Sequence, residues 1–301
     1  MQKDILSHIG KSLYKVNILK EYKRYVVFRT RCMLHKKQID RLLNFFDESE
    51  ARRQLLLHTP SFVEQTTRGF FYKNSTWQER TDIVQEHILF LQNRFTASFT
   101  ENIYIRKKPL VLWQNDYAGK PLSLRLEFNA GQRKEGCLSL VLHYDGEPLY
   151  QIIFWLGSSR DKNETTVHIG ALQGPASGNA IVKDLTKAFF GYRTKNLIFY
   201  GLRSFASAAG IEKIFAVGNS GYYAMNHIRM NRKLKTSFDN FWLEVEGIPC
   251  EDKRFYVIPV QEKRKTMEEL KPSKRAQHRR RFEKMDEILA AVQQNLQPFL
   301  K

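Results

Sequence analysis

The sequence predicts an α+β protein in which a helical N-terminal region packs on a mixed, mostly antiparallel sheet. Two observations support this fold class. Apolar residues recur at helical spacing over 1–97 and then alternate at strand spacing over 100–175. The chain has 301 residues, of which 42% are hydrophobic, so it can bury a substantial core. We expect a helical region over 1–99, a sheet region over 100–262 and a basic helix over 263–301.

The N-terminal region contains three helical patterns. The third begins at Thr76, where Thr76 and Glu79 have capping-box spacing, so that each side chain satisfies a backbone donor of the other residue. Its apolar side then comprises Ile83, His87, Leu89, Phe90 and Leu91. The first two patterns are runs at helical spacing: Ile5, Ile9, Leu13 and Val16, then Ile39, Leu42, Leu43 and Phe46.

The next segment predicts an antiparallel meander. Residues 122–128 alternate apolar and polar side chains, which indicates a half-buried strand. Strands over 137–144 and 148–156 flank Asp145-Gly146, a favoured hairpin turn. A further strand over 165–172 ends at Gly174-Pro175.

The rest of the chain alternates helices and strands. Residues 177–210 are predicted to be helical, with a break at 191–195 and Gly210 as the C-terminal cap. Strands follow over 211–217, 241–245 and 255–260. The tail from Met267 is predicted to be helical, with an interruption at 271–273.

The charge balance favours polyanionic partners. The chain has 49 Lys and Arg against 31 Asp and Glu, a net charge of +18. Such an excess suits nucleic acid, anionic lipid head groups or phosphorylated small molecules. A basic, solvated surface without a specific partner is the alternative reading.

Cysteine usage and hydropathy favour a location inside the cell. Cys32, Cys137 and Cys250 are odd in number and far apart, which excludes a disulfide framework and a CxxC zinc site. The N-terminus has no apolar run long enough for a signal-peptide core, and apolar runs elsewhere are strand-sized. We expect a protein that is either cytoplasmic or peripheral to the inner membrane.

Six motifs occupy, in this order, residues 168–175, 184–187, 191–195, 214–219, 239–242 and 273–282. Together they resemble the VirK/YbjX family of Gram-negative bacteria, which includes LapB of the Pasteurellaceae. The family implies no catalytic residue. It is associated with virulence, outer-membrane protein localisation, resistance to cationic antimicrobial peptides and stress responses. The resemblance implies an envelope factor of unknown molecular activity.

The element order around residues 176–180 is similar to the acyl-CoA-binding half of GNAT acetyltransferases. Their Gln/Arg-x-x-Gly-x-Gly/Ala loop binds a pyrophosphate, as free N–H groups at a helix start favour anions. The loop here is two residues longer, and Pro175 removes one donor. An ordinary Gly-Pro turn is the alternative. The resemblance implies acyl-CoA as a ligand of Gln173, Gly174, Ser177, Gly178, Asn179, Ala180 and Lys183, with Lys187, Arg193 and Lys195 nearby.

The candidate catalytic residues are Tyr222, Tyr223 and His168, with Asn226 and His227 close in sequence. In an acyl transfer to an amine, a base removes the amine proton and a tyrosine protonates the leaving thiolate. The structural alternative is that both tyrosines pack behind a buried strand and that His168 is structural. HExxH, GxSxG and Walker motifs are missing from the sequence, and we expect no metal site.

The C-terminal segment is the candidate anion-binding element. Its density of positive charge suits an anionic membrane face or nucleic-acid phosphate, and a solvated helix face is the alternative. Arg281 is expected to point inward. Zinc-finger and RNP motifs are missing, so a nucleic-acid-binding stress protein ranks below the envelope-factor and transferase readings. The candidate residues are Lys271, Lys274, Arg275, Arg279, Arg280, Arg281 and Lys284.

Overall fold

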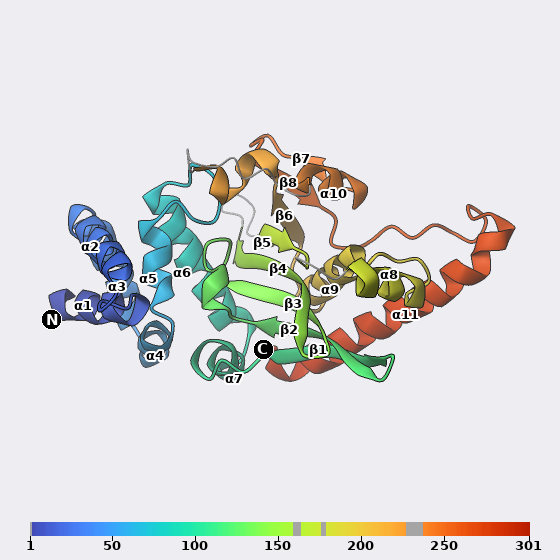
Figure 1. Cartoon of the computed structure of the whole chain (residues 1–301), viewed down its shortest axis with the longest axis horizontal. Helices are drawn as coiled ribbons and strands as arrows, with labels where there is room; N and C mark the ends of the chain where they lie inside the picture. The colour runs from blue at the N-terminus through green and yellow to red at the C-terminus, as the bar shows by residue number, and fades with distance from the viewer. Residues whose placement is uncertain (1, 159–163, 176–178, 227–236) are drawn as a thin grey trace.

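The computed structural model describes residues 2–158, 164–175, 179–226 and 237–301 and confirms the α+β class. Helices at the N-terminus stand beside a central sheet, and further helices flank its other side (Figure 1). The N-terminal helices are α1 (Gln2–Leu13), α2 (Leu19–Leu34), α3 (Lys36–Asp47), α4 (Glu50–His58), α5 (Ser61–Thr67), α6 (Trp77–Arg94) and α7 (Ala97–Thr100), followed by the π-helical turn η1 (Glu101–Ile105).

Local sequence signals explain several of these boundaries. The capping box at Thr76 and Glu79 forms as predicted and starts α6. In α3, Ile39, Leu42, Leu43 and Phe46 are all buried, which confirms the expected apolar side. Helix α1 ends at Leu13, so Val16, which the predicted helical run included, lies beyond the helix, in a turn where 37% of its surface is exposed.

The sheet has eight strands in the order β1-β2-β3-β4-β5-β6-β8-β7. Strands β2 to β5 form the predicted antiparallel meander, β1 adds an antiparallel strand that was not predicted, and β5 pairs with β6 in parallel. Asp145 and Gly146 both have positive φ, as a two-residue hairpin turn between β3 and β4 requires. The strands are β1 (Leu110–Tyr117), β2 (Lys120–Glu127), β3 (Leu138–Tyr144), β4 (Glu147–Ser158), β5 (Thr165–Gln173), β6 (Lys213–Val217), β7 (Ile248–Pro249) and β8 (Phe255–Ile258).

The crossover from β5 to β6 contains two helices, and the break between them lies where the sequence predicted it. Gly191 and Gly210 both have positive φ, so each ends a helical segment in a conformation that glycine adopts at low cost. The remaining elements are α8 (Asn179–Ala188), α9 (Thr194–Ala208), α10 (Phe238–Glu244), α11 (Pro272–Leu296) and the 3₁₀ turns η2 (Ala130–Gln132), η3 (Asn219–Gly221), η4 (Tyr223–Asn226) and η5 (Gln297–Phe299).

Two predictions about the C-terminal part were wrong. Residues 241–245 are not a strand: they lie in and just after α10, whose N-cap Ser237 accepts a hydrogen bond from the Asn240 backbone. Phe238, Phe241 and Trp242 of α10 are buried, which is a helical spacing. Pro272 does not interrupt a helix either, because it starts α11, where its missing N–H has no partner to lose.

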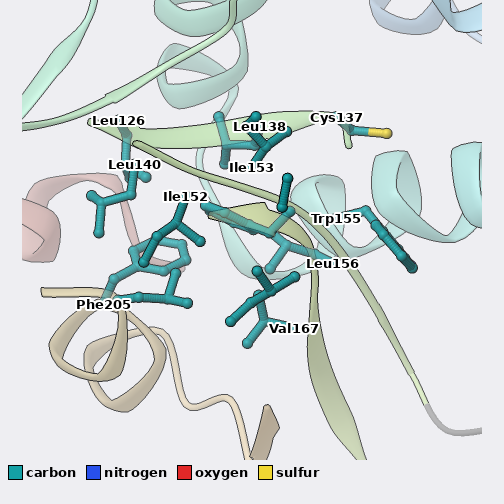
Figure 2. Packing of buried hydrophobic residues seen from close by; sticks show 14 of the residues in the cluster. Leu126, Cys137, Leu138, Leu140, Ile152, Ile153, Trp155, Leu156, Val167 and Phe205 are labelled. Atoms are coloured by element: carbon teal, nitrogen blue, oxygen red, sulfur yellow. The ribbon is translucent and has the colours of Figure 1, made fainter. Parts of the chain in front are cut away.

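One hydrophobic cluster connects all parts of the chain. It includes Ile9 of α1, Phe46 of α3, Phe154 of β4 and Val292 of α11. Figure 2 shows side chains of β2, β3, β4 and β5 packed beside Phe205 of α9. Helix α6 contacts β4, and α11 contacts both β1 and α9, so the C-terminal helix is part of the core.

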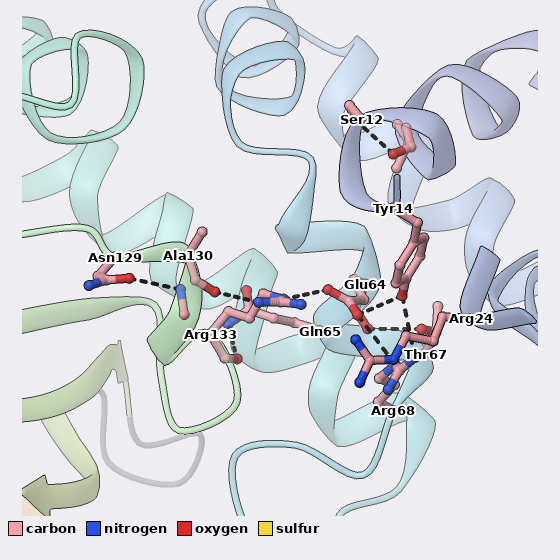
Figure 3. Close-up of polar contacts among 12 residues, drawn as sticks. Ser12, Tyr14, Arg24, Glu64, Gln65, Thr67, Arg68, Asn129, Ala130 and Arg133 are labelled. Carbon is pink, nitrogen blue, oxygen red and sulfur yellow. Dashed lines mark hydrogen bonds and ion pairs between the residues drawn. The ribbon is translucent and has the colours of Figure 1, made fainter. Parts of the chain in front are cut away.

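A buried carboxylate ties the N-terminal helices to the sheet. Glu64 of α5 is 1% exposed and forms ion pairs with Arg68 and with Arg133, which precedes β3. Tyr14, which follows α1, donates a hydrogen bond of 2.6 Å to the same carboxylate (Figure 3). Burial, and then the Glu64 charge, raise the pKa of Tyr14.

Candidate functional site

His168 lies in a stacked row of rings across three strands. The register places it between Trp155 of β4 and Phe215 of β6. Its ring centroid is 5.2 Å from that of Trp155 and 5.0 Å from that of Phe215, with nearly parallel planes. Nε2 lies 3.0 Å from the Thr166 hydroxyl, and burial lowers the pKa of His168 to about 4. These contacts match the structural reading of His168.

Tyr222 and Tyr223 converge on a carboxyl group that sequence reasoning missed. The Tyr222 hydroxyl donates to Oε1 of Glu135 over 3.3 Å, and Tyr223 also hydrogen-bonds to Glu135. Glu135 is 5% exposed, and burial raises its pKa to about 7, although Lys134 and the two tyrosines act in the opposite direction. Burial, followed by the charge of Glu135, raises the pKa of Tyr222.

Two glycines bring the backbone of Glu135 onto the sheet. A Cβ on Gly170 of β5 would overlap the Glu135 carbonyl oxygen, and a Cβ on Gly136 would lie 2.6 Å from the Phe154 carbonyl oxygen. Gly170 lies at an irregularity in the β4–β5 register, where Ile153 pairs with Ala171 and Phe154 with Ile169. Glycine is therefore required at both positions for this close approach.

Hydrogen bonds hold the segment before β3 from two sides. The Gln65 side chain donates to the carbonyls of Arg133 and Gly136, each over 2.8 Å. The backbone N–H of Phe71 donates to the Lys134 carbonyl over 2.8 Å. Glu135 is thus a fixed residue despite lying in a connection between elements.

A row of polar side chains leads from Glu135 across the sheet. Gln173, a predicted site residue, donates to Glu135 over 3.4 Å and accepts from Gln151 of β4 over 2.7 Å. Gln132 donates to Gln151 and accepts from Ser139 of β3. The structure therefore joins Gln173, Tyr222 and Tyr223 through Glu135, and the result is a partly buried polar network with one acidic group.

The network lies where two parallel strands stop pairing. Residues 166–169 of β5 pair with residues 213–216 of β6, whereas β5 continues to Gln173. Tyr222 follows the end of β6 and forms a bridge with Tyr72. Glu135 and Tyr222 therefore lie beside the part of β5 that extends past the last β5–β6 pair.

The predicted ligand loop is described only at its ends. Ser177 and Gly178 lie outside the described residues, as does His227. Gly174 packs against Tyr150, whose ring would be 2.8 Å from a Cβ at that position, so a side chain of the chain itself occupies this space. Asn179 is the first residue of α8, and Ala180 and Lys183 follow it with exposed side chains.

The cations expected near this loop have partners elsewhere. Arg193 forms an ion pair with Glu244, and Lys187 lies 3.7 Å from Asp184. The ammonium group of Lys195 lies 3.9 Å from the centre of the Phe241 ring, and burial lowers its pKa to about 8.

The basic residues of α11 divide into two groups. Arg281 points inward as expected, because its guanidinium donates to the Phe190 carbonyl and lies over Tyr192. Lys284 pairs with Glu287. The side chains of Lys271, Lys274, Arg275, Arg279 and Arg280 are exposed.

Comparison with known proteins identifies the family. A family model described as "Protein of unknown function (DUF535)" matches residues 17–294. The chain belongs to the DUF535 family. It is 28% identical over 240 residues to "Uncharacterized protein YbjX" of Escherichia coli, which covers 78% of this chain and 72% of the relative. An uncharacterized protein of Haemophilus influenzae is 24% identical over 266 residues, covering 87% and 86%. No solved structure matches the chain.

The predicted resemblance is thus confirmed for YbjX and the DUF535 family. None of the helices described for this DUF535 protein is long and apolar enough to span a membrane. Among its described residues, no three His, Cys, Asp or Glu side chains gather in the way that metal ligands would.

Proposed function

We propose that this DUF535 protein is an acyltransferase in which Glu135 is the general base. The observation that carries the proposal is a buried carboxyl group with a pKa near 7, hydrogen-bonded to two tyrosines beside the part of β5 that extends past its last pair with β6. A general base works best when its pKa lies close to the operating pH. A meander followed by a parallel strand across a helical crossover supports the GNAT-like reading.

The proposed chemistry assigns one proton transfer to each group. Acyl-CoA would supply a thioester activated toward attack by an amine. Glu135 takes the proton that the attacking amine loses, and Tyr222 donates a proton to the departing sulfur. Gln173 holds the Glu135 carboxyl group in place through its amide. The backbone N–H groups at the start of α8, with Lys183 nearby, are the described groups suited to a phosphate.

The amine acceptor is proposed to be an envelope component. This choice rests on the VirK/YbjX resemblance, whose members are associated with outer-membrane protein localisation and resistance to cationic antimicrobial peptides. Addition of an acyl group to an amine removes a positive charge or adds apolar surface, and either change alters how an envelope component interacts with cationic peptides.

The test combines calorimetry with a thiol-release assay. We expect heat of binding with acetyl-CoA or a long-chain acyl-CoA, and thiol release when an amine is added. Glu135→Gln should keep the binding heat and lose turnover at least about 100-fold, because it keeps the hydrogen bonds but cannot accept a proton. No binding heat with either donor, from protein that unfolds cooperatively, would contradict the proposal.

A second candidate role is binding of anionic surfaces by α11. The observation that favours it is the group of exposed cations over the first turns of this helix, from Lys271 to Arg280. Basic residues near an anionic bilayer each contribute about 1 kcal/mol of attraction. This role is compatible with the transferase activity, since α11 and Glu135 occupy different elements.

A further inference from the structure

Helix α2 turns an apolar stripe away from the core. Phe28 and Cys32 are its buried residues. At 100° per residue the stripe lies on the opposite side of the helix, whereas a surface helix usually turns its apolar side to the core. The stripe consists of Leu19 (71% exposed), Tyr22 (48%), Val26 (42%), Val27 (43%), Met33 (74%) and Leu34 (76%).

Basic residues border this stripe. Between residues 15 and 37 the chain has eight Lys and Arg residues and one acidic residue, Glu21. Glu21 pairs with Arg24 over 2.6 Å, so the rest of the segment remains strongly positive. On the helix, Lys20, Arg24 and Arg31 follow one edge of the stripe and Arg29 follows the other, while the exposed Lys23 and Thr30 lie within it.

We infer that α2 is a membrane-docking helix that lies in the surface of an anionic bilayer. An apolar stripe with cationic borders is typical of helices that bury one side at the boundary between head groups and acyl chains. Tyr22 at the edge of the stripe is a residue type enriched at that boundary. Sixteen residues give a helix about 24 Å long, enough to contact several lipids.

The positive charge of α2 favours a lipid surface over a second copy of the chain as the partner that covers the stripe. Two α2 helices packed through their stripes would bring two strongly basic segments together, and like charges at close range repel. Phospholipid head groups with negative charge complement the same residues. The anionic bilayer is therefore the occupant that both the apolar and the charged residues fit.

The inner side of α2 holds it in place before any lipid binds. The Phe28 ring lies 6.0 Å from that of Tyr14, and the Tyr25 hydroxyl is 3.3 Å from that of Ser7 in α1. Arg31 donates to the Thr67 carbonyl of α5. A helix that is already folded loses little conformational entropy on docking, which favours binding. In Figure 1, α2 lies at the opposite end of the molecule from the start of α11.

The experiment measures co-flotation of the full chain with vesicles of phosphatidylcholine alone and of phosphatidylcholine with 30% phosphatidylglycerol. The test variant replaces Leu19, Val26 and Met33 with Ser. We expect its affinity for the anionic vesicles to fall at least about tenfold, because three apolar side chains no longer enter the bilayer. Its melting temperature should stay within a few degrees of the wild type, since all three side chains are exposed.

Two further variants make the result specific. Leu243 and Ile248 are exposed apolar residues of α10 and β7, and replacing both with Ser should leave vesicle binding unchanged. Replacing Lys274, Arg279 and Arg280 with Ser tests α11 separately and should leave the depth of α2 unchanged. That depth is read from quenching of a Val26→Trp variant by brominated lipids.

Three results would overturn the inference. The first is equal binding by the α2 variant and the wild type, and the second is a Val26→Trp signal that brominated lipids do not quench. The third is a chain that does not bind vesicles but forms a dimer that the α2 substitutions dissociate, which would make a second copy the occupant. Because no acyl donor enters the assay, these results are independent of the transferase proposal.

Discussion

A carboxyl group that loses its hydration keeps its proton to a high pH when the hydrogen bonds that it accepts come from neutral donors and stabilise its charged form too weakly to offset burial. Glu135 is such a group, since the hydrogen-bond partners of its side chain are Gln173, Tyr222 and Tyr223. The nearby charge is Lys134, whose side chain is exposed and therefore screened by solvent. Burial consequently dominates, and the carboxyl group titrates near neutral pH.

The first prediction concerns the pH dependence of stability. The pKa of Glu135 is about 7 in the folded protein, above the ordinary glutamate value of 4.5, so the folded state binds this proton more tightly than the unfolded state does. Stability should therefore fall as the pH rises from 4.5 through about 7, and level off above it. Glu135→Gln removes this loss and should be more stable than the wild type at pH 8 by about 2–4 kcal/mol.

Urea unfolding at pH 5 and pH 8 measures the effect. At pH 5 the wild type and Glu135→Gln should differ little, because Glu135 is still protonated when folded. Glu251→Gln is the matched control at an exposed position and should follow the wild type at both pH values. The raised pKa would be contradicted if the difference in unfolding free energy between the wild type and Glu135→Gln were the same at pH 5 and pH 8.

At the scale of elements, Glu64 determines how the N-terminal helices attach to the sheet. Its carboxylate joins α5 to Tyr14 and to Arg133, which lies in the same segment as Glu135. The ion pairs are only partly screened, since Glu64 is 1% exposed while Arg68 and Arg133 are 27% and 22% exposed. Loss of this charge would leave two arginines near a buried site without their counter-ion.

The second prediction is that Glu64→Gln destabilises the fold by about 2–4 kcal/mol. Glu50→Gln is the control, because Glu50 pairs with Arg53 on an exposed surface and should contribute less than about 1 kcal/mol. Denaturant midpoints of the two variants and the wild type provide the measurement. Similar small losses for both variants would mean that the buried charge does not stabilise the attachment.

Elements with strong local signals were predictable from the sequence. The capping box of α6 and the Asp145-Gly146 hairpin form because the required partners lie within four residues of each other. Helix α10 was misread because the window 241–245 is apolar and aromatic, which favours a strand. Its helical spacing becomes visible only when Ser237 and Phe238 are included.

The candidate site was predictable only in part, for a physical reason. Tyr222, Tyr223 and Gln173 were chosen from the sequence, and the structure brings them together. Glu135, which joins them, belongs to no motif and lies in a connection. Its burial depends on Gly170, 35 positions later in the chain, and such a long-range contact has no local sequence signal.

At the scale of the whole molecule, the core is continuous across the three regions defined from the sequence. The cluster extends from Ile9 through the sheet to Leu296, and α11 packs on both β1 and α9. The β1-to-β5 meander, with a helix on either side, therefore shares side-chain contacts with both ends of the chain. We therefore expect loss of contacts at one end to lower the stability of the whole core.

The last prediction follows from this continuity: the chain should unfold in one cooperative transition. Leu42 of α3 and Ile288 of α11 are both essentially fully buried, at 0% and 1% exposure. Leu42→Ala and Ile288→Ala should each cost about 2–5 kcal/mol. Each should shift the same transition, whether it is followed by circular dichroism or by fluorescence of the four tryptophans.

Leu34→Ala is the control, because Leu34 is 76% exposed and its truncation should change stability by less than about 0.5 kcal/mol. If the regions were independent, Leu42→Ala would lower an early transition and Ile288→Ala a separate one. Two resolved transitions of this kind would contradict the continuous core. A single shifted transition in both variants would mean that α11 and the N-terminal helices stabilise one folding unit, so that a substitution in either can disturb the segment holding Glu135.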